Sequence, residues 1–239
     1  MNRDIIKSKV ASILENTPNL ELPVNIKHVT KFYKHCKCRL IPFSHYMKTN
    51  QINYEEMLSF ANTKDAFCNY IASEKQAIIF YNDVDKSLIS SNRYRWNIAH
   101  ELGHIALGHL TRGNSSRLFR TTLTDIQDPE AEIEADQFAS YILVPYIVLR
   151  QLKIQSAEEL MKICKISKQA AQIRYEQYLK WDDFPCQYDY RVLAQYYNIL
   201  KTKYGCDCRD YIDRCNRTET REPLFAIITI RGNYDKYTY

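Results

Sequence analysis

Glycine and proline are scarce in this chain, and long apolar runs are missing. Only 5 Gly and 7 Pro occur among 239 residues, while apolar residues make up 45%. This composition excludes a disordered or fibrous chain and indicates a globular protein that is long enough to bury a full core. Residues 1–9 are charged throughout, and no apolar stretch of the length of a signal peptide or membrane span follows them. We therefore expect a cytoplasmic protein that does not bind a membrane.

Strong charge and paired cysteine motifs are also lacking. The net charge is only +5, which is too small to indicate either a nucleic acid or an acidic partner. In the cytosol the eight cysteines should be reduced thiols rather than a disulfide framework. Neither group of Cys has the spacing of a structural zinc site, so we expect no second zinc there. These groups are His35 with Cys36 and Cys38, and the C-terminal Cys186, Cys206, Cys208 and Cys215.

Hydrophobic periodicity and capping residues predict an α+β fold with a small, mostly antiparallel sheet. Ser156 and Ser167 can each cap a helix, and Asp128 followed by Pro129 fits the start of another. Helices are predicted at 3–16, 23–33, 53–62, 92–110, 128–144 and in two segments between 156 and 180; strands are predicted at 39–43, 66–72, 76–81 and 224–230. The sheet should pack on the helix at 92–110.

The segment His100-Glu101-Leu-Gly-His104 is an HExxH motif within the predicted helix at 92–110. With 3.6 residues per turn, His104 lies roughly 40° round the helix from His100, so both imidazoles can bind one ion. Glu101 lies roughly 100° round from His100, beside the metal, where its carboxylate can take a proton from a water molecule. This pattern predicts one catalytic zinc, with Glu101 as general base.

A third ligand is expected from the next helix, because a catalytic zinc usually has three protein ligands and an open position. Glu132 and Asp136 are four residues apart and share one face, while Glu134 points roughly 200° away from Glu132. Glu132 lies at the edge of the apolar stripe, nearer the predicted core than Glu134. We assign Glu132 as the third ligand and Asp136 as the acceptor that orients a ligand histidine.

His109 is not expected to bind the ion. It follows His100 by nine residues, which places it roughly on the opposite face of a continuous helix. A metzincin would need a histidine six residues after His104, where this chain has Leu110.

Two longer segments carry a family resemblance. Arg93-Tyr-Arg-Trp-Asn-Ile-Ala-His100-Glu-Leu-Gly-His104 and Glu132-Ile-Glu-Ala-Asp-Gln-Phe-Ala-Ser-Tyr-Ile-Leu-Val-Pro145 resemble the ImmA/IrrE family of metallo-endopeptidases, although Val144 stands where the family usually has Met. The resemblance covers about residues 70–180 and ends in a segment, 166–174, that is similar to a helix-turn-helix. It implies a zincin-like fold, a gluzincin-like site with two His and one Glu, and cleavage of a transcriptional repressor of a mobile element or stress response.

The resemblance divides the chain into a peptidase domain at 1–180 and a Cys- and Tyr-containing extension at 181–239 of unknown role. We expect a protein substrate, bound by backbone pairing along an edge strand at 76–81 and selected by docking on the extension. Tyr94, Arg93 and Arg95 near the start of the motif helix are unranked candidates for stabilising the oxyanion.

The alternative is a DNA-binding or scaffolding module with a vestigial or structural metal site. In that case residues on the helices between 156 and 180 would face a DNA groove; these are Lys165, Lys168, Gln169, Gln172 and Arg174. We favour the peptidase and expect no nucleic acid partner, because few basic residues line this face.

Overall fold

The computed structural model describes residues 3–111, 117–118, 128–180 and 185–218. The helices and strands of this part, in chain order, are α1 (Arg3–Glu15), α2 (Ile26–Lys31), β1 (Lys37–Pro42), α3 (Phe43–Asn50), α4 (Tyr54–Ala61), β2 (Ala66–Ile71), η1 (Ala72–Glu74), β3 (Gln76–Tyr81), α5 (Lys86–Ser90), α6 (Arg93–Ala106), η2 (His109–Thr111), β4 (Arg117–Leu118), α7 (Pro129–Leu143), α8 (Tyr146–Leu152), α9 (Ala157–Cys164), α10 (Lys168–Leu179), α11 (Gln187–Tyr204) and α12 (Arg209–Thr218). The strand predicted at 224–230 lies outside the described residues.

One four-stranded sheet, in the order β1-β3-β2-β4, contains all the described strands. β1 runs parallel to β3, while β2 is antiparallel to both β3 and β4. The predicted α+β fold with a small, mostly antiparallel sheet is therefore confirmed. The edge-strand prediction for 76–81 was wrong, because β3 pairs with β1 on one side and β2 on the other. Its near-continuous burial fits an interior strand rather than an edge.

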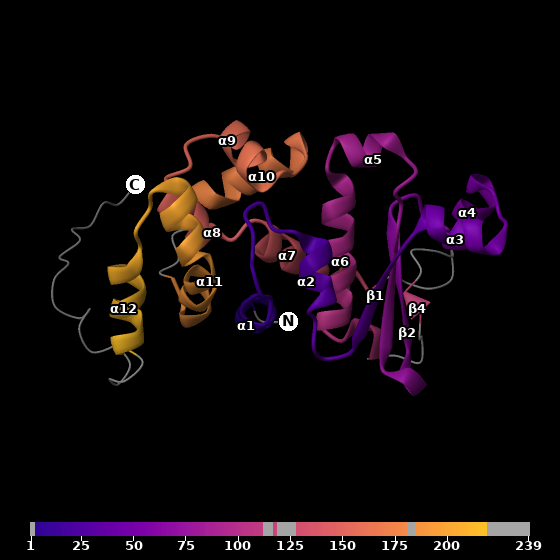
Figure 1. Ribbon diagram of the computed structural model, residues 1–239, viewed down its shortest axis with the longest axis horizontal. Coiled ribbons are helices and arrows are strands. Elements are labelled where there is room, and N and C mark those ends of the chain that lie inside the picture. Colours follow the sequence, from indigo (N-terminus) through magenta and orange to yellow (C-terminus); the bar gives the residue numbers. More distant parts are fainter. Residues whose placement is uncertain (1–2, 112–116, 119–127, 181–184, 219–239) are drawn as a thin grey trace, which may run out of the picture.

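Helix α6, which carries the HExxH motif, lies between the sheet and the remaining large helices (Figure 1). It is buried along most of its length because apolar side chains face both neighbours. Ile98, Ala99 and Leu102 are fully buried and belong to the main core cluster, together with residues of β2, β3 and α7. The motif is therefore held on a rigid element with packing on two sides.

Gly103 lets α6 and α7 approach closely. A Cβ atom at this position would lie 3.1 Å from Phe138 Cδ1 and 3.2 Å from both the Cα and the O of Ala135. These separations are tighter than ordinary carbon contacts, so a larger residue would push the two helices apart. The glycine inside the HExxH motif thus helps to set how near α7 comes to the two histidines.

The predicted helix starts are confirmed by their caps. The Ser156 side chain accepts a hydrogen bond from the Glu159 N–H, and Ser167 accepts one from Ala170. Asp128 accepts from the N–H groups of the first turn of α7, and Pro129 follows it at the first helical position. These interactions are local, which is why the sequence alone located them.

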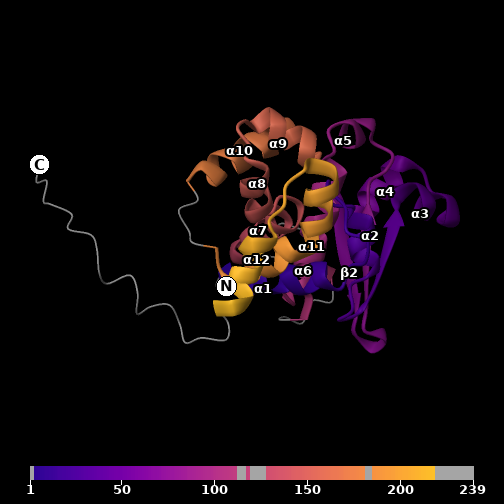
Figure 2. The same cartoon turned by 60° about the vertical axis from the view of Figure 1, so that its left-hand side comes forward.

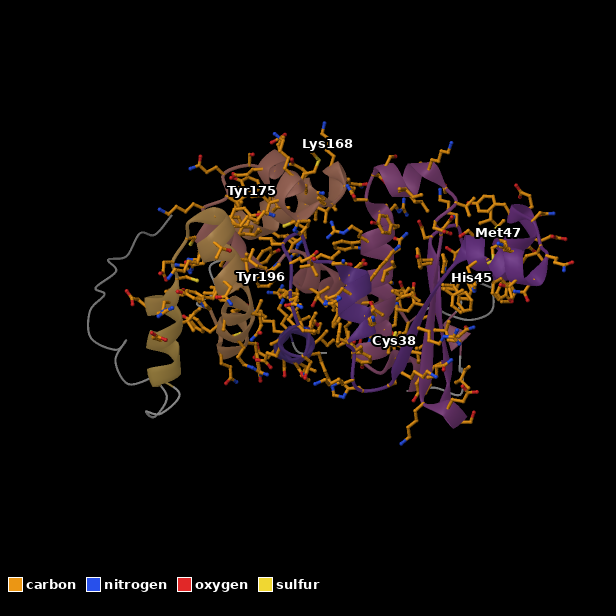
Figure 3. The ribbon with its side chains drawn as sticks, viewed as in Figure 1. Cys38, His45, Met47, Lys168, Tyr175 and Tyr196 are labelled. Atoms are coloured by element: carbon orange, nitrogen blue, oxygen red, sulfur yellow. The ribbon has the colours of Figure 1, made fainter. Side chains whose placement is uncertain are left out.

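Helix α11 packs against α1 and α8 on the side of α6 away from the sheet (Figures 1 and 2). Its buried residues, Leu193, Tyr196 and Leu200 among them, belong to the main core cluster, and Tyr196 lies among the helices (Figure 3). Lys7 of α1 forms a partly buried ion pair with Asp189 of α11, at 3.1 Å. The first helix of the extension is thus part of the same core as the first helix of the chain. No helix among the described residues, α11 included, combines the length and apolar character needed to cross a membrane.

Candidate metal centre

Three side chains from α6 and α7 converge on one point. The Nε2 atoms of His100 and His104 lie 3.0 Å apart. The Glu132 carboxylate lies between them, with Oε2 3.2 Å from His100 Nε2 and Oε1 3.4 Å from His104 Nε2. The two histidines are one turn apart on α6, and Glu132 reaches them from the first turn of α7. The two histidines therefore lie on one face of α6, as their spacing of four residues predicted.

These distances match what a tetrahedral metal site requires. Bonds of about 2.0–2.1 Å to a central zinc place neighbouring ligand atoms roughly 3.3 Å apart. His100 and His104 are each 2% exposed, whereas the Glu132 side chain is 29% exposed, so the site is closed on the helix side and accessible on the other. Across the described ranges, no other group of three His, Cys, Asp or Glu has ligand atoms this close together. The donor set, two imidazoles and one carboxylate, fits zinc.

The second ring nitrogen of His100 is held by Asp136. Its Nδ1 lies 2.8 Å from Asp136 Oδ1, one helical turn beyond Glu132 on α7. Burial favours the neutral ring, but the hydrogen bonds to Asp136 and Glu132 prevail and raise the pKa of His100 to about 9. The hydrogen bonds from His100 and His104 in turn hold the pKa of Glu132 well below its ordinary range. Asp136 therefore occupies the place expected of the orienting acceptor.

The second ring nitrogen of His104 faces His109, a contact that the sequence did not predict. His104 Nδ1 lies 3.0 Å from His109 Nδ1, and His109 Nε2 lies 3.0 Å from Glu134 Oε2. The expectation that His109 lies on the opposite face was wrong, because α6 ends at Ala106 and the chain turns back at Gly108, where φ is 75°. A glycine shortly after a helical pattern is a usual helix terminator, and Gly108 is the signal that could have revealed this.

Glu134 is also placed differently from the expectation. It is 6% exposed, and so is less exposed than the half-buried Glu132. The apolar stripe on α7 placed Glu132 nearer the core, but α7 turns its Glu134 face toward η2 and buries that carboxylate against His109. The two glutamates thus contact different partners: Glu132 lies against the two Nε2 atoms, and Glu134 lies behind them.

Glu101 is 5% exposed and adjoins the sheet. It interacts with Cys68 of β2: burial raises the pKa of the Cys68 thiol well above its ordinary value, and the negative charge of Glu101 adds to the rise. This places the Glu101 carboxylate on the side of α6 that faces β2, next to the three converging residues rather than among them.

Arg95 is a structural residue in this fold. Its Nη1 donates to the carbonyl oxygens of Cys164, at 2.7 Å, and of Lys165, and its Nη2 donates to Val24 at 2.5 Å. The first two bonds satisfy carbonyls at the end of α9, where the helix itself leaves them unpaired, and the third reaches the segment before α2. Arg95 links α6 to α9 through these bonds. It is therefore not available to stabilise an oxyanion, although the sequence had made it one of three candidates.

A family model described as the IrrE N-terminal-like domain, peptidase M78, matches residues 51–176, which is more than half of the chain. No curated protein sequence matches the chain. The matched range contains α6, α7 and the three converging residues, and it ends within α10. The resemblance noted from the two motifs is thereby confirmed. The chain belongs to the peptidase M78 family, that of the IrrE N-terminal-like domain.

Proposed function

We propose that this protein is a zinc-dependent metallo-endopeptidase in which His100, His104 and Glu132 bind the ion and Glu101 is the general base. The convergence of two Nε2 atoms and one carboxylate within 4.8 Å carries the proposal. Membership of a peptidase family supports hydrolysis of a peptide bond rather than a structural role for the metal.

The residues divide the chemistry between them. Zinc, when bound, supplies positive charge that polarises a carbonyl group and lowers the pKa of a nearby water. Glu101 accepts the proton of the attacking water and returns it to the leaving amine. Asp136 and His109, backed by Glu134, lie against the Nδ1 atoms of His100 and His104, so both Nε2 atoms would be left to the ion when it is bound. The Glu132 side chain is partly exposed, so an extended chain can reach the site from that side.

For the substrate, we propose one specific cytosolic protein, a helix-turn-helix repressor, cut once in an exposed segment. The family resemblance supports the repressor, and the need to spare other cytosolic proteins supports selectivity. The test is to incubate the purified protein and zinc or manganese with casein and with the repressor encoded by the neighbouring reading frame. A single cut in the repressor with casein intact is expected. Broad digestion of casein would contradict the proposed selectivity.

A DNA-binding function receives no support from α9 and α10. Lys168 points outward from α10 (Figure 3), but Arg174 is 7% exposed and packs on Tyr146, so it does not face outward as the DNA-binding alternative requires. An exposed face with few cations supplies little of the phosphate attraction on which DNA binding depends.

His109 and Glu134, which we call the relay behind His104, lead to a second testable prediction. We expect His109→Ala and Glu134→Gln each to weaken zinc binding by about 10–100-fold without abolishing it, because His104 loses the partner that fixes its ring. Competition with a chromophoric chelator measures this affinity. The exposed Glu130 on the same helix offers a matched control, since Glu130→Gln makes the same chemical change away from the relay. Unchanged affinity in both relay variants would show that His109 does not orient His104.

A further inference from the structure

A cavity of about 550 Å³ lies between α6, α7 and α10. Figure 1 shows α10 facing the first turns of α6 across this region. Its wall includes Trp96 and Asn97 of α6, Ile133 and Asp136 of α7, and Arg174 and Gln177 of α10. Asp136 also contacts His100, so the cavity begins at the residue next to the metal centre. Its volume suits several side chains of a bound polypeptide.

Arg174 is an unusual residue for such a wall, because its charge is buried and incompletely paired. It is 7% exposed, and its guanidinium carbon lies 4.3 Å from the centre of the Tyr146 ring. Nη1 donates to Gln177 Oε1 at 2.6 Å, but Nε and Nη2 are buried with no hydrogen-bond partner among the described residues. A guanidinium stays protonated, and buried donors without acceptors are costly.

The described surroundings supply no carboxylate for this charge. Burial lowers the pKa of Arg174, and the groups whose charges oppose that shift are tyrosines and a cysteine rather than an acid. The acid on the cavity wall, Asp136, accepts from His100, and the other cation there, Arg93, pairs with Asp65 at 2.9 Å. The cavity therefore contains a buried positive charge for which a visiting anion would be the natural partner.

Gln177 acts as the acceptor in place of an anion. Its Oε1 accepts from both Arg174 Nη1 and the Tyr146 hydroxyl, yet the residue is exposed and lines the cavity. A neutral amide oxygen is a weaker acceptor for a guanidinium than a carboxylate. The exposed Ile133 and Ile173 also line the cavity and give it apolar surface for the stem of an incoming side chain.

We propose that this cavity is a subsite for an acidic side chain of the polypeptide substrate, whose carboxylate displaces Gln177 and pairs with Arg174. The proposal rests on the peptidase function proposed above, and it defines the substrate class as a chain with Asp or Glu near the cut bond. Asp136 lines the cavity and also contacts His100 of the metal centre. The acidic residue of the substrate should therefore lie within a few positions of the cut bond.

Two substitutions test this subsite in different ways. Arg174→Met keeps the unbranched stem and removes the charge. Gln177→Glu is isosteric, lies at an exposed position and supplies a built-in carboxylate to Arg174. Gln172→Glu makes the same change on an exposed part of α10 that does not line the cavity, and serves as the matched control.

The measurement is fluorescence polarisation with labelled nonapeptides of Ala and Leu that carry a single Glu, or in a matched set a single Gln, at each position in turn. Binding is measured in the Glu101→Gln background, so that no peptide is consumed. At one or more positions Glu should bind roughly tenfold more tightly than Gln. That preference should disappear with Arg174→Met and with Gln177→Glu, and remain with Gln172→Glu. No preference at any position, or a preference that survives both cavity variants, would overturn the proposal.

Thermal unfolding adds a readout that does not depend on peptides. Gln177→Glu should unfold at a higher temperature than the parent, because its carboxylate pairs with the buried guanidinium, whereas Gln172→Glu should not. A lower unfolding temperature for Gln177→Glu would contradict the inference that the Arg174 guanidinium lacks an anionic partner. Peptides that bind through Arg174 but are never cut by the zinc-loaded parent would instead overturn the peptidase proposal and leave the anion subsite standing.

Discussion

Replacing Glu101 by glutamine is expected to abolish cleavage of the proposed repressor substrate while the metal and the fold remain. The amide has the same shape as the carboxylate but cannot accept the proton of the attacking water. Loss of a general base typically costs about 10²–10⁴-fold in rate. Glu101 lies beside the three converging residues rather than among them, so zinc content by elemental analysis should stay at the level of the parent.

The control for this variant is Glu55→Gln, the same change at an exposed position on α4, outside the metal centre. It should leave both cleavage and zinc content unchanged. A Glu101→Gln protein that cuts as fast as the parent would exclude Glu101 as the base, whatever its metal content.

Removing a metal ligand should have a different signature. We expect His100→Ala and Glu132→Ala each to lose zinc altogether under conditions where the parent retains one ion, because only two protein ligands remain at the site. Glu134→Gln should retain zinc with weakened affinity, since Glu134 contacts His109 and not the two Nε2 atoms. Elemental analysis after dialysis separates these results. Zinc loss in the Glu134 variant alone would reverse the assignment of the two glutamates.

Part of the secondary structure was predictable from short-range signals. The strand at 76–81 and the starts of α7, α9 and α10 follow from alternation and from single capping residues, which act over a few positions. Helices α3, α5, α8, α11 and α12 were not predicted. α3 and α8 start directly after a proline and have no side-chain cap, so no cap marks their beginning, whereas α5 follows a capping residue, Asp85, that was overlooked.

The candidate site divides in the same way. His100 and His104 share a helix, and Glu132 and Asp136 share another, so the helical period alone relates the members of each pair. The relation between the two pairs depends on how closely α6 and α7 approach, which Gly103 and Ala135 decide through their packing. The roles of His109 and Glu134 depend on where α6 ends and how the chain turns at Gly108, which a continuous helical wheel misplaces.

The sequence by itself determined which residues are proposed to carry the chemistry: two histidines and a glutamate as metal ligands, spaced by the helical period on two helices, and a general base one residue after the first ligand. Only the tertiary structure decided that β3 is an interior strand, that Glu134 is less exposed than Glu132, that α11 shares a core with α1, and that Arg174 is buried beside a cavity. The physical reason is the distance along the chain over which each interaction acts. Periodicity and capping act within one element, whereas strand order, burial and the pairing of a buried charge depend on contacts between residues far apart in the chain.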